Sequence, residues 1–125
     1  MREIKFRVWH KADEKMYEVY GFAQNKWFLK GKQFPMPNGS VVIMQYTGLK
    51  DKNGKEIYEG DICETVTYSG KPFGTIDVVK FSGGAFKLTD IEDALLPIPL
   101  DDSDIQSVEV IGNIYENPEL LEWKE

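Results

Sequence analysis

The sequence predicts a mainly β protein that forms a small antiparallel barrel or strongly bent sheet, with SH3-like character, as one domain over residues 1–125. Three observations predict this fold. The chain contains three Trp, six Tyr and seven Phe, which favour a pleated, half-buried surface. Short apolar segments alternate with turn signals that contain glycine, and no long amphipathic helix is predicted between them. Closure into a barrel would remove the exposed edges of a small antiparallel sheet.

The chain begins with a predicted hairpin over residues 4–20. Ile4, Phe6 and Val8 occupy alternate positions, so we expect them to line the inner face of its first strand. A short strand is expected at residues 27–29. The N-terminal third is therefore predicted to consist of strands.

A loop and a buried strand are expected next. Residues 33–39 should form a loop, because Pro35 and Pro37 fix φ and lack an amide donor. Residues 41–46 carry apolar side chains at successive positions, which is typical of a strand covered on both faces. This segment is the clearest buried strand in the sequence.

Residues 45–62 are expected to be the hub around which the other strands are arranged. Asn53-Gly54 is the dipeptide best suited to a two-residue type I′ turn, in which both central residues need a positive φ. Gly48 and Gly60 lie towards the two ends of the stretch. The sequence therefore predicts a tight hairpin at its centre.

The remaining chain is predicted to form a meander with short helical turns. Further strands are expected at residues 57–58, 62–68, 75–81, 85–88 and 108–111. A glycine-proline turn at 69–74 and a tight turn at Gly83-Gly84 should join three of them. A helical turn is expected near residues 90–96, and a short C-terminal helix should begin at Asn117-Pro118, an N-cap followed by proline.

Three features of the sequence are those expected of a cytosolic protein. No apolar segment approaches the roughly 20 residues that span a bilayer, and the N-terminus lacks the pattern of a secretory signal. A single cysteine agrees with a reducing compartment. We therefore expect a cytoplasmic protein without a membrane partner.

The net charge of −6 conceals an asymmetry along the chain. Residues 1–55 carry eleven Lys and Arg against five acidic residues, whereas residues 56–125 carry four against sixteen. One interpretation is that the two halves interleave in one fold and pair across strands, each surface pair contributing little stability. The other is a body with a basic face and an acidic face, which could stack head to tail or meet a charged partner.

Three stretches of the sequence resemble the YopX family of phage and prophage proteins. They are residues 1–9 (MREIKFRVW), residues 44–62 (MQYTGLKDKNGKEIYEGDI) and residues 110–121 (VIGNIYENPELL). They occur in the family's order and span the whole chain. The resemblance implies a mostly β domain encoded by a bacteriophage or prophage and acting in the cytoplasm of the bacterial host. It implies no activity and no catalytic residue.

The sequence contains no convincing metal site. Asp51-Lys52-Asn53-Gly54 is similar to the start of a calcium loop, but that template needs Gly at position 6 and Glu at position 12, where this chain has Glu56 and Ile62. One Cys and one His cannot complete a tetrahedral zinc site within a monomer. No metal or other cofactor is therefore expected.

The residues that could act as nucleophile or base have simpler structural interpretations. Cys63 lies at the start of a strand, where a buried cysteine usually serves as a small hydrophobe, and His10 follows the first strand as a residue of the hairpin end. Glu59 and Asp61 could do acid/base work, but the Asp61 side chain more often shapes a turn by accepting hydrogen bonds from nearby amides. We expect no catalytic site, no small-molecule substrate and no enzyme activity.

Basic and aromatic residues in the N-terminal half form the predicted interaction face. Its residues are Lys5, Arg7, Trp9, Lys26 and Trp27. Such a face is typical of proteins that hold single-stranded nucleic acid by charge and stacking. A sequence pI near 4.9 disfavours that function, because the acidic half repels phosphates.

The sequence therefore predicts an accessory protein that acts by association with a protein partner, either itself or a host or phage protein. The alternative is a nucleic-acid-binding accessory protein that uses the basic-aromatic face. The charge asymmetry and the surplus of aromatic residues motivate the first hypothesis, and the basic N-terminal half motivates the alternative.

Overall fold

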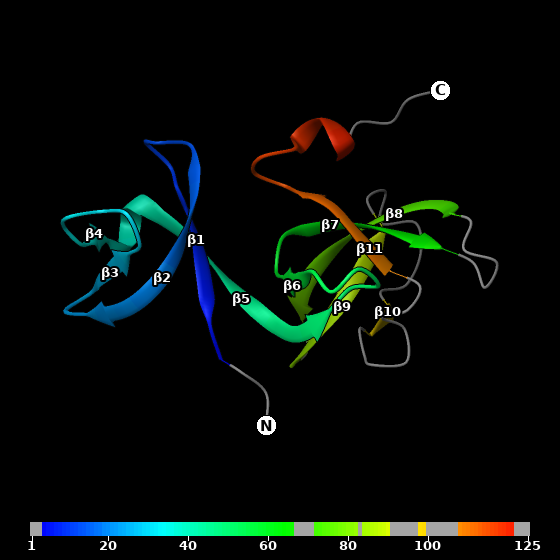
Figure 1. The fold of residues 1–125 in the computed structure, drawn as a ribbon, viewed down its shortest axis with the longest axis horizontal. Helices are drawn as coiled ribbons and strands as arrows, with labels where there is room; N and C mark the ends of the chain where they lie inside the picture. Colours follow the sequence, from blue (N-terminus) through cyan, green and yellow to red (C-terminus); the bar gives the residue numbers. More distant parts are fainter. Residues whose placement is uncertain (1–3, 67–71, 83, 91–97, 100–107, 122–125) are drawn as a thin grey trace. The chain divides into compact units, whose positions relative to one another are not determined.

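A computed structural model of the chain describes residues 4–66, 72–82, 84–90, 98–99 and 108–121 (Figure 1). The chain divides into two compact units, Met1–Tyr46 and Thr47–Glu125. Strands dominate both units, so the predicted mainly β class is confirmed. That the two units make one domain over residues 1–125 stays a prediction.

The first unit is built from the strands that precede Tyr46. These are β1 (Phe6–His10), β2 (Lys15–Ala23), β3 (Lys26–Leu29), β4 (Met36–Pro37) and the first part of β5 (Val41–Lys50). The 3-10 helix η1 (Asn38–Ser40) precedes β5. The sheet has the order β4-β3-β2-β1-β5-β6, in which β6 (Glu56–Tyr58) belongs to the second unit. The predicted hairpin, the short strand and the buried strand are all present.

The core of the first unit lies on one face of this sheet. Val8 is completely buried in β1, between Tyr17 of β2 and Ile43 of β5 in the strand register. Leu29 and Val41 complete the buried cluster. Ile4 is 73% exposed and precedes β1, so its predicted place on the inner face is wrong. The alternation of side chains holds only within the paired strand, which begins at Phe6.

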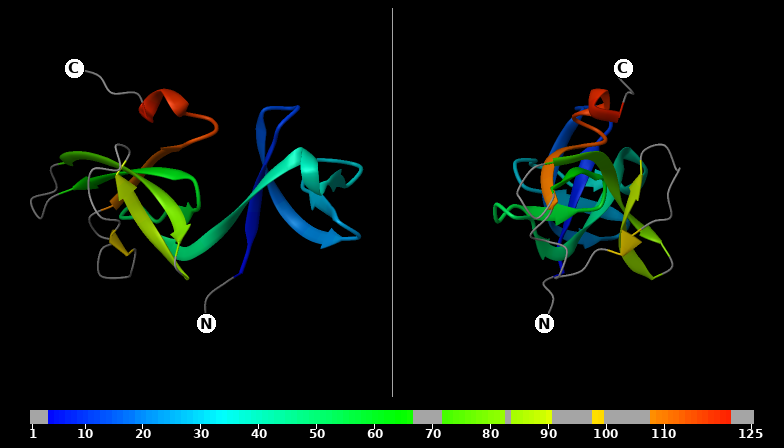
Figure 2. Two further views of the ribbon diagram at one scale, coloured as in Figure 1. Left: turned by 180° about the vertical axis from the view of Figure 1, so that it is seen from behind. Right: turned by 90° about the vertical axis from the view of Figure 1, so that its right-hand side faces the viewer.

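The second unit contains a five-stranded sheet of order β10-β9-β8-β7-β11. Its elements are β7 (Asp61–Val66), β8 (Pro72–Ser82), β9 (Ala85–Asp90), β10 (Ile98–Pro99), β11 (Val108–Asn113) and the 3-10 helix η3 (Pro118–Leu121). Figure 2 shows η3 in red directly after β11 in orange. The core consists of Ile57, Cys63, Val79, Phe86, Leu88, Val108 and Val110.

The expected closed barrel is not found among the described residues, and its SH3-like character is not confirmed. Both sheets are antiparallel and open. One edge of each sheet is a two-residue strand that ends in proline, β4 in the first sheet and β10 in the second. Proline has no amide to offer a further strand, so a short edge of this kind blocks continued pairing without closure.

Residues 33–39 are not the plain loop that their prolines predict. Met36 and Pro37 form β4 opposite Trp27 and Lys26, and Asn38 begins η1. Proline is tolerated there because the strand is at the edge of the sheet. The predicted C-terminal helix is confirmed as the 3-10 helix η3. Asp90, the first residue of the helical turn predicted near 90–96, ends β9 instead, and residues 91–96 lie outside the described residues, as do residues 67–71 of the predicted strand and turn.

The two-residue type I′ turn predicted at Asn53-Gly54 is wrong. Gly54 has a φ of 83°, but Asn53 does not have a positive φ. The Gly54 amide donates to the Asp51 carbonyl, and the Asp51 amide donates to the Lys55 carbonyl, so the loop has three residues. Such loops combine a type I turn with a glycine of positive φ. The Asp51 side chain sets this loop by accepting the amides of Asn53 and Lys55.

A two-residue turn with positive φ at both positions occurs elsewhere, between β2 and β3. Gln24 has a φ of 52° and Asn25 a φ of 63°, and Ala23 pairs with Lys26. These values are those of a type I′ hairpin. Local sequence indicates this turn only weakly, because the strongly favoured glycine is absent from the second position.

Candidate interaction surface

Cys63 is part of the core of the second unit. Its side chain has no exposed surface and packs in the cluster that includes Ile57 and Val79. Burial strongly raises the pKa of the Cys63 thiol, and the negative charges of Asp61 and Asp51 raise it further. These surroundings disfavour the thiolate that a nucleophile requires.

The Asp51 carboxylate fastens the loop after β5 to the edge of β11. Its Oδ1 accepts the amides of Asn53 and Lys55 at 2.8 and 2.9 Å, and its Oδ2 accepts the buried amide of Val110 at 2.8 Å. The Lys52 amide also donates to the Val108 carbonyl. These bonds occupy the outer edge of β11. The Asp51 carboxylate thus has a structural role that the calcium-loop comparison did not anticipate.

Asp61 has the turn-forming role expected from the sequence. It is almost fully buried, and its Oδ2 accepts the Tyr58 amide at 2.8 Å. The neighbouring Gly60 has a φ of 85°, donates its amide to Val79 and accepts the Ile114 amide. This segment therefore holds three parts of the second unit together.

A corner after β11 is built from two asparagines that the sequence analysis did not single out. The Asn113 Oδ1 accepts the amides of Tyr115 and Glu116, and the Asn117 Oδ1 accepts the Asn113 amide. A Cβ added to Gly112 would lie 2.6 Å from the Asn117 Oδ1. Glycine at position 112 therefore allows the Asn117 side chain to fold back onto the chain.

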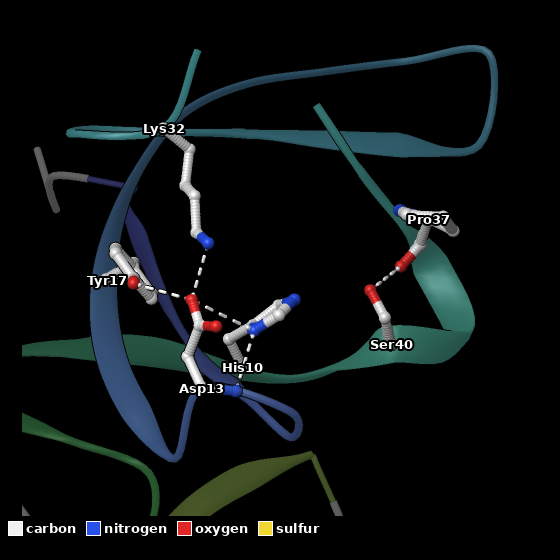
Figure 3. Close-up of polar contacts among 6 residues, drawn as sticks. All are labelled: His10, Asp13, Tyr17, Lys32, Pro37 and Ser40. Carbon is white, nitrogen blue, oxygen red and sulfur yellow. Dashed lines mark hydrogen bonds and ion pairs between the residues drawn. The ribbon is translucent and has the colours of Figure 1, made fainter. Parts of the chain in front are cut away.

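A group of titratable side chains ties the β1–β2 loop to Lys32 in the first unit (Figure 3). The Asp13 Oδ2 accepts the Tyr17 hydroxyl at 2.8 Å and forms an ion pair with the Lys32 ammonium. The buried His10 ring accepts the Asp13 amide at Nδ1, 3.2 Å away. Figure 3 also shows the Ser40 hydroxyl donating to the Pro37 carbonyl.

The charges of this group shift the pKa values of its members in opposite directions. Hydrogen bonds from Lys32 and then from Tyr17 lower the pKa of Asp13 below its usual value. The same hydrogen bonds to Asp13 raise the pKa values of Tyr17 and Lys32. The arrangement therefore favours an ionised Asp13, a neutral Tyr17 and a charged Lys32. The Asp13 carboxylate already accepts two donors, Tyr17 and Lys32, so we interpret its role as holding the β1–β2 loop in place.

The structure separates Trp27 from the other residues of the predicted interaction face. Arg7 and Trp9 alternate with the buried Val8 in β1, so they occupy the sheet face opposite the core. Lys26 alternates with Trp27 in β3 and is exposed. The Trp27 ring instead packs against the core cluster. That these residues bind a partner stays a prediction.

Lys5 lies just before β1 and faces an aromatic ring. Its Nζ is 5.0 Å from the centre of the buried Tyr46 ring, and its carbonyl accepts the Tyr46 amide. This cation–π contact helps to fix the start of the chain against β5. Part of the predicted face is thus used within the first unit.

A row of three aromatic rings extends the core face of the first unit towards solvent. The centre of the Trp27 ring lies 6.0 Å from that of Phe6 and 4.4 Å from that of Phe22. We call Phe6, Trp27 and Phe22 the aromatic row. Phe22 is 51% exposed, although it is a large apolar side chain. The row therefore ends at a solvent-facing phenylalanine.

Two further aromatic side chains of the first unit are strongly exposed. Tyr20 is 69% exposed in β2 and Phe34 is 68% exposed before β4. Tyr20 lies against Phe28, with ring centres 6.1 Å apart. The register of β2 and β3 shifts between Val19 and Gly21, so simple alternation does not predict where Tyr20 and Phe22 point. Phe34 lies outside these strands, so alternation does not apply to it.

Comparison with known proteins identifies the family. The sequence matches the YopX protein family over residues 5–122. The chain belongs to the YopX family. No curated protein matches it at a significant level.

Two solved structures are similar to this YopX-family chain. Protein EF1440 from Enterococcus faecalis is 28% identical, with a TM-score of 0.69, and the match covers 98% of this chain and 100% of that one. The YopX protein from Bacillus subtilis is 26% identical, with a TM-score of 0.60, and the match covers 100% of both chains. The resemblance read from the three sequence stretches is therefore confirmed.

Two of those three YopX-like stretches meet in the second unit. Asp51 binds the Val110 amide, Gly60 accepts the Ile114 amide, and Asp61 pairs with Asn113 across β7 and β11. Their polar side chains mainly accept backbone amides. Both stretches therefore help to hold the second unit of this YopX-family chain together.

Neither a metal site nor a membrane helix is found in the part of the chain that the structure describes. Its His, Cys, Asp and Glu side chains form no group of three that could hold a metal ion. Its helices are too short to cross a bilayer.

Proposed function

We propose that this YopX-family protein acts by associating with another protein through its first unit and has no catalytic site. The observation that carries this proposal is the exposure of Tyr20, Phe22 and Phe34, each more than half accessible to solvent. Large aromatic side chains are enriched at the centres of protein interfaces and contribute much of the binding energy there.

The polar groups most suggestive of catalysis have structural roles within the second unit, which supports a protein without a catalytic site. Asp51 accepts three backbone amides, and Asp61 accepts one within a buried turn. The Cys63 thiol is buried, with a raised pKa. A catalytic group would need to reach a substrate in a suitable protonation state.

We propose further that the protein is encoded by a phage or prophage and acts in the cytoplasm of a bacterial host. Membership of the YopX family supports the phage origin through the resemblance described above. The single cysteine is a free thiol buried in the core, which agrees with a reducing compartment.

Nucleic-acid binding is the second candidate function, and the separation of charge between the units favours it. The first unit carries eight Lys and Arg against four acidic residues, whereas the second carries seven against seventeen. The acidic pI of the chain thus arises from the second unit. Exposed rings on a basic unit could stack on the bases of a single strand.

Affinity capture of the full chain from host lysate, with and without nuclease, tests both candidates. Partners would be identified by mass spectrometry for the wild type, Phe22→Ala and Phe81→Ala. Phe81 is the matched control, because it is also 51% exposed but lies in the second unit. We expect a nuclease-resistant partner that Phe22→Ala loses and Phe81→Ala retains.

Other results would decide against the proposal. If every partner were lost after nuclease treatment, the result would favour nucleic-acid binding over protein association. Equal retention by wild type and Phe22→Ala would contradict an interface at the exposed aromatic side chains. Circular dichroism of each variant would establish that it is folded.

A further inference from the structure

We infer that the surface which covers the aromatic row belongs to the second unit of another copy of this chain. The inference rests on the proposed function and names its partner. The contact would be head to tail, with the first unit of one copy against the second unit of the next.

The first unit has a small core, and its aromatic row ends at the exposed Phe22. It comprises 46 residues, and its described core cluster contains three buried side chains, Val8, Leu29 and Val41. The apolar residues packed on that cluster are only partly buried, among them Tyr17, Val19, Trp27, Met36 and Ile43. Units of this size usually gain stability from disulfides, metals or further packing surfaces.

Disulfides and metals do not supply that stability to the first unit. Its sequence contains no cysteine, because the single cysteine of the chain is Cys63. Its described residues include no group that could hold a metal ion. Packing against another surface remains, and the aromatic row continues from the core to the exposed Phe22.

Charge indicates which surface fits. The first unit has a surplus of four basic residues, and the second has a surplus of ten acidic residues. Lys26 is an exposed member of this basic surplus, and it lies in β3 on the sheet face opposite Trp27. A second copy of the chain therefore presents a surface of opposite charge, and such surfaces attract at low ionic strength.

Two different surfaces of one chain would meet in this contact. Such a heterologous contact closes into a ring or continues as an open chain, according to the rotation between copies. Association should therefore rise with protein concentration and fall with added salt.

Sedimentation velocity of the full chain over about 1 to 100 μM, at low salt and at 0.5 M salt, tests the inference. We expect association that weakens with salt. Phe22→Ala should raise the dissociation constant about tenfold or more, as loss of an aromatic residue at an interface does. Circular dichroism and the melting temperature would show whether this variant is folded.

A pair of charge reversals provides a matched control. Lys26→Glu and Lys55→Glu change the net charge equally, but Lys26 lies in the basic unit and Lys55 is exposed in the acidic unit. We expect Lys26→Glu to raise the dissociation constant about fivefold and Lys55→Glu to leave it unchanged or lower it. Equal weakening by both reversals would overturn the inference, because it would reflect net charge alone.

The combined results of sedimentation and affinity capture show whether self-association, the proposed function, or both are wrong. A monomer at all concentrations, together with capture of a different protein that depends on Phe22, would overturn self-association and leave the proposed function standing. A monomer with no Phe22-dependent partner would overturn both. Self-association that Phe22→Ala leaves intact would place the contact elsewhere and overturn the inference.

Discussion

Asp51 is the residue whose side chain has the most structural consequences in the second unit. Its carboxylate accepts the amides of Asn53, Lys55 and Val110, and the Asp51 side chain is largely buried. A buried amide left without an acceptor is costly, and hydrogen bonds to charged groups are stronger than neutral ones. Asp51 therefore connects the loop after β5 to the edge of β11.

We predict that Asp51→Ala lowers the free energy of unfolding by about 3 kcal/mol, since it leaves the Val110 amide buried without its acceptor. Urea denaturation would measure the change. Lys52→Ala is the control, because its exposed ion pair with Glu109 should contribute less than about 0.5 kcal/mol. Similar losses for the two variants would show that Asp51 has no special role.

The close approach of the Asn117 side chain to Gly112 predicts that no larger residue fits at position 112 without cost. A methyl group there would lie 2.6 Å from Oδ1 and 2.8 Å from Cγ of Asn117. We expect Gly112→Ala to cost about 1 to 3 kcal/mol, because Asn117 must move and release the Asn113 amide. Thermal denaturation would measure this cost, and Gly39→Ala, which meets no atom within 4 Å, is the control.

The same prediction can be tested in a second background. In Asn117→Ala the two closest atoms are absent, so Gly112→Ala should cost less there than in the wild type. An equal cost in both backgrounds would mean that the clash with Asn117 is not the cause.

Asp13 should make the stability of the first unit depend on pH at both extremes. The pKa of Asp13 is lowered in the fold, so its stabilising effect is present above the usual Asp value, about 4, and is lost as the pH falls through the lowered pKa. The pKa values of Tyr17 and Lys32 are raised, so their effect is complete below about pH 10 and is lost as the pH rises further.

Asp13→Asn therefore should be less stable than the wild type between about pH 5 and 9, and the difference should shrink below pH 4 and above pH 10. Melting temperatures across this range would test the prediction. A difference that is constant at every pH would contradict a contribution from the Asp13 charge.

At the scale of elements, the hairpin between β2 and β3 is the feature that places the aromatic row. Gln24 and Asn25 both have a positive φ, and Phe22 pairs with Trp27 immediately beyond them. Glutamine is poorly suited to such a backbone conformation, whereas Asn-Gly is the preferred dipeptide. The turn is thus formed although its residues are not optimal.

We predict that the double substitution Gln24→Asn and Asn25→Gly stabilises the protein by about 0.5 to 1 kcal/mol, since it relieves the strain of a positive φ. Chemical denaturation would measure this change. The same pair introduced at Lys11 and Ala12, whose φ values are not positive, should not stabilise. Destabilisation by the first pair would contradict the assignment of a type I′ turn.

Alternation within single strands places only some residues of the predicted interaction face. The alternation in β1 correctly placed Arg7 and Trp9 opposite Val8. Trp27 could not be assigned, because the shift in register between Val19 and Gly21 changes which side chains of β2 and β3 share a face. Irregularities of this kind follow from packing and are not visible in a local pattern.

At the scale of the whole molecule, β5 continues across the boundary between the two units. The strand runs from Val41 to Lys50, and the boundary falls between Tyr46 and Thr47. If the chain is one domain, as the sequence predicts, it should unfold in a single transition with equal calorimetric and van't Hoff enthalpies. Two separate transitions in scanning calorimetry would contradict that prediction.

The sequence by itself determined the mainly β class, most of the strands, the family and the unequal distribution of charge. These properties depend on composition, on local alternation of side chains and on residue order, all of which can be read without a fold. It also indicated that Asp61 forms a turn and that Cys63 is a core residue. Both expectations agree with the structure.

Only the tertiary structure decided how the sheets end, which loop Asp51 builds and which aromatic side chains are exposed. Each described sheet ends at one edge in a two-residue strand, and the Asp51 carboxylate overrides the turn preference of Asn53-Gly54. The exposure of Tyr20 and Phe22 is seen only in the folded unit, where the register shift in β2 precedes the pairing of Phe22 with Trp27. Each depends on partners distant in the sequence, so the preferences of neighbouring residues cannot specify it.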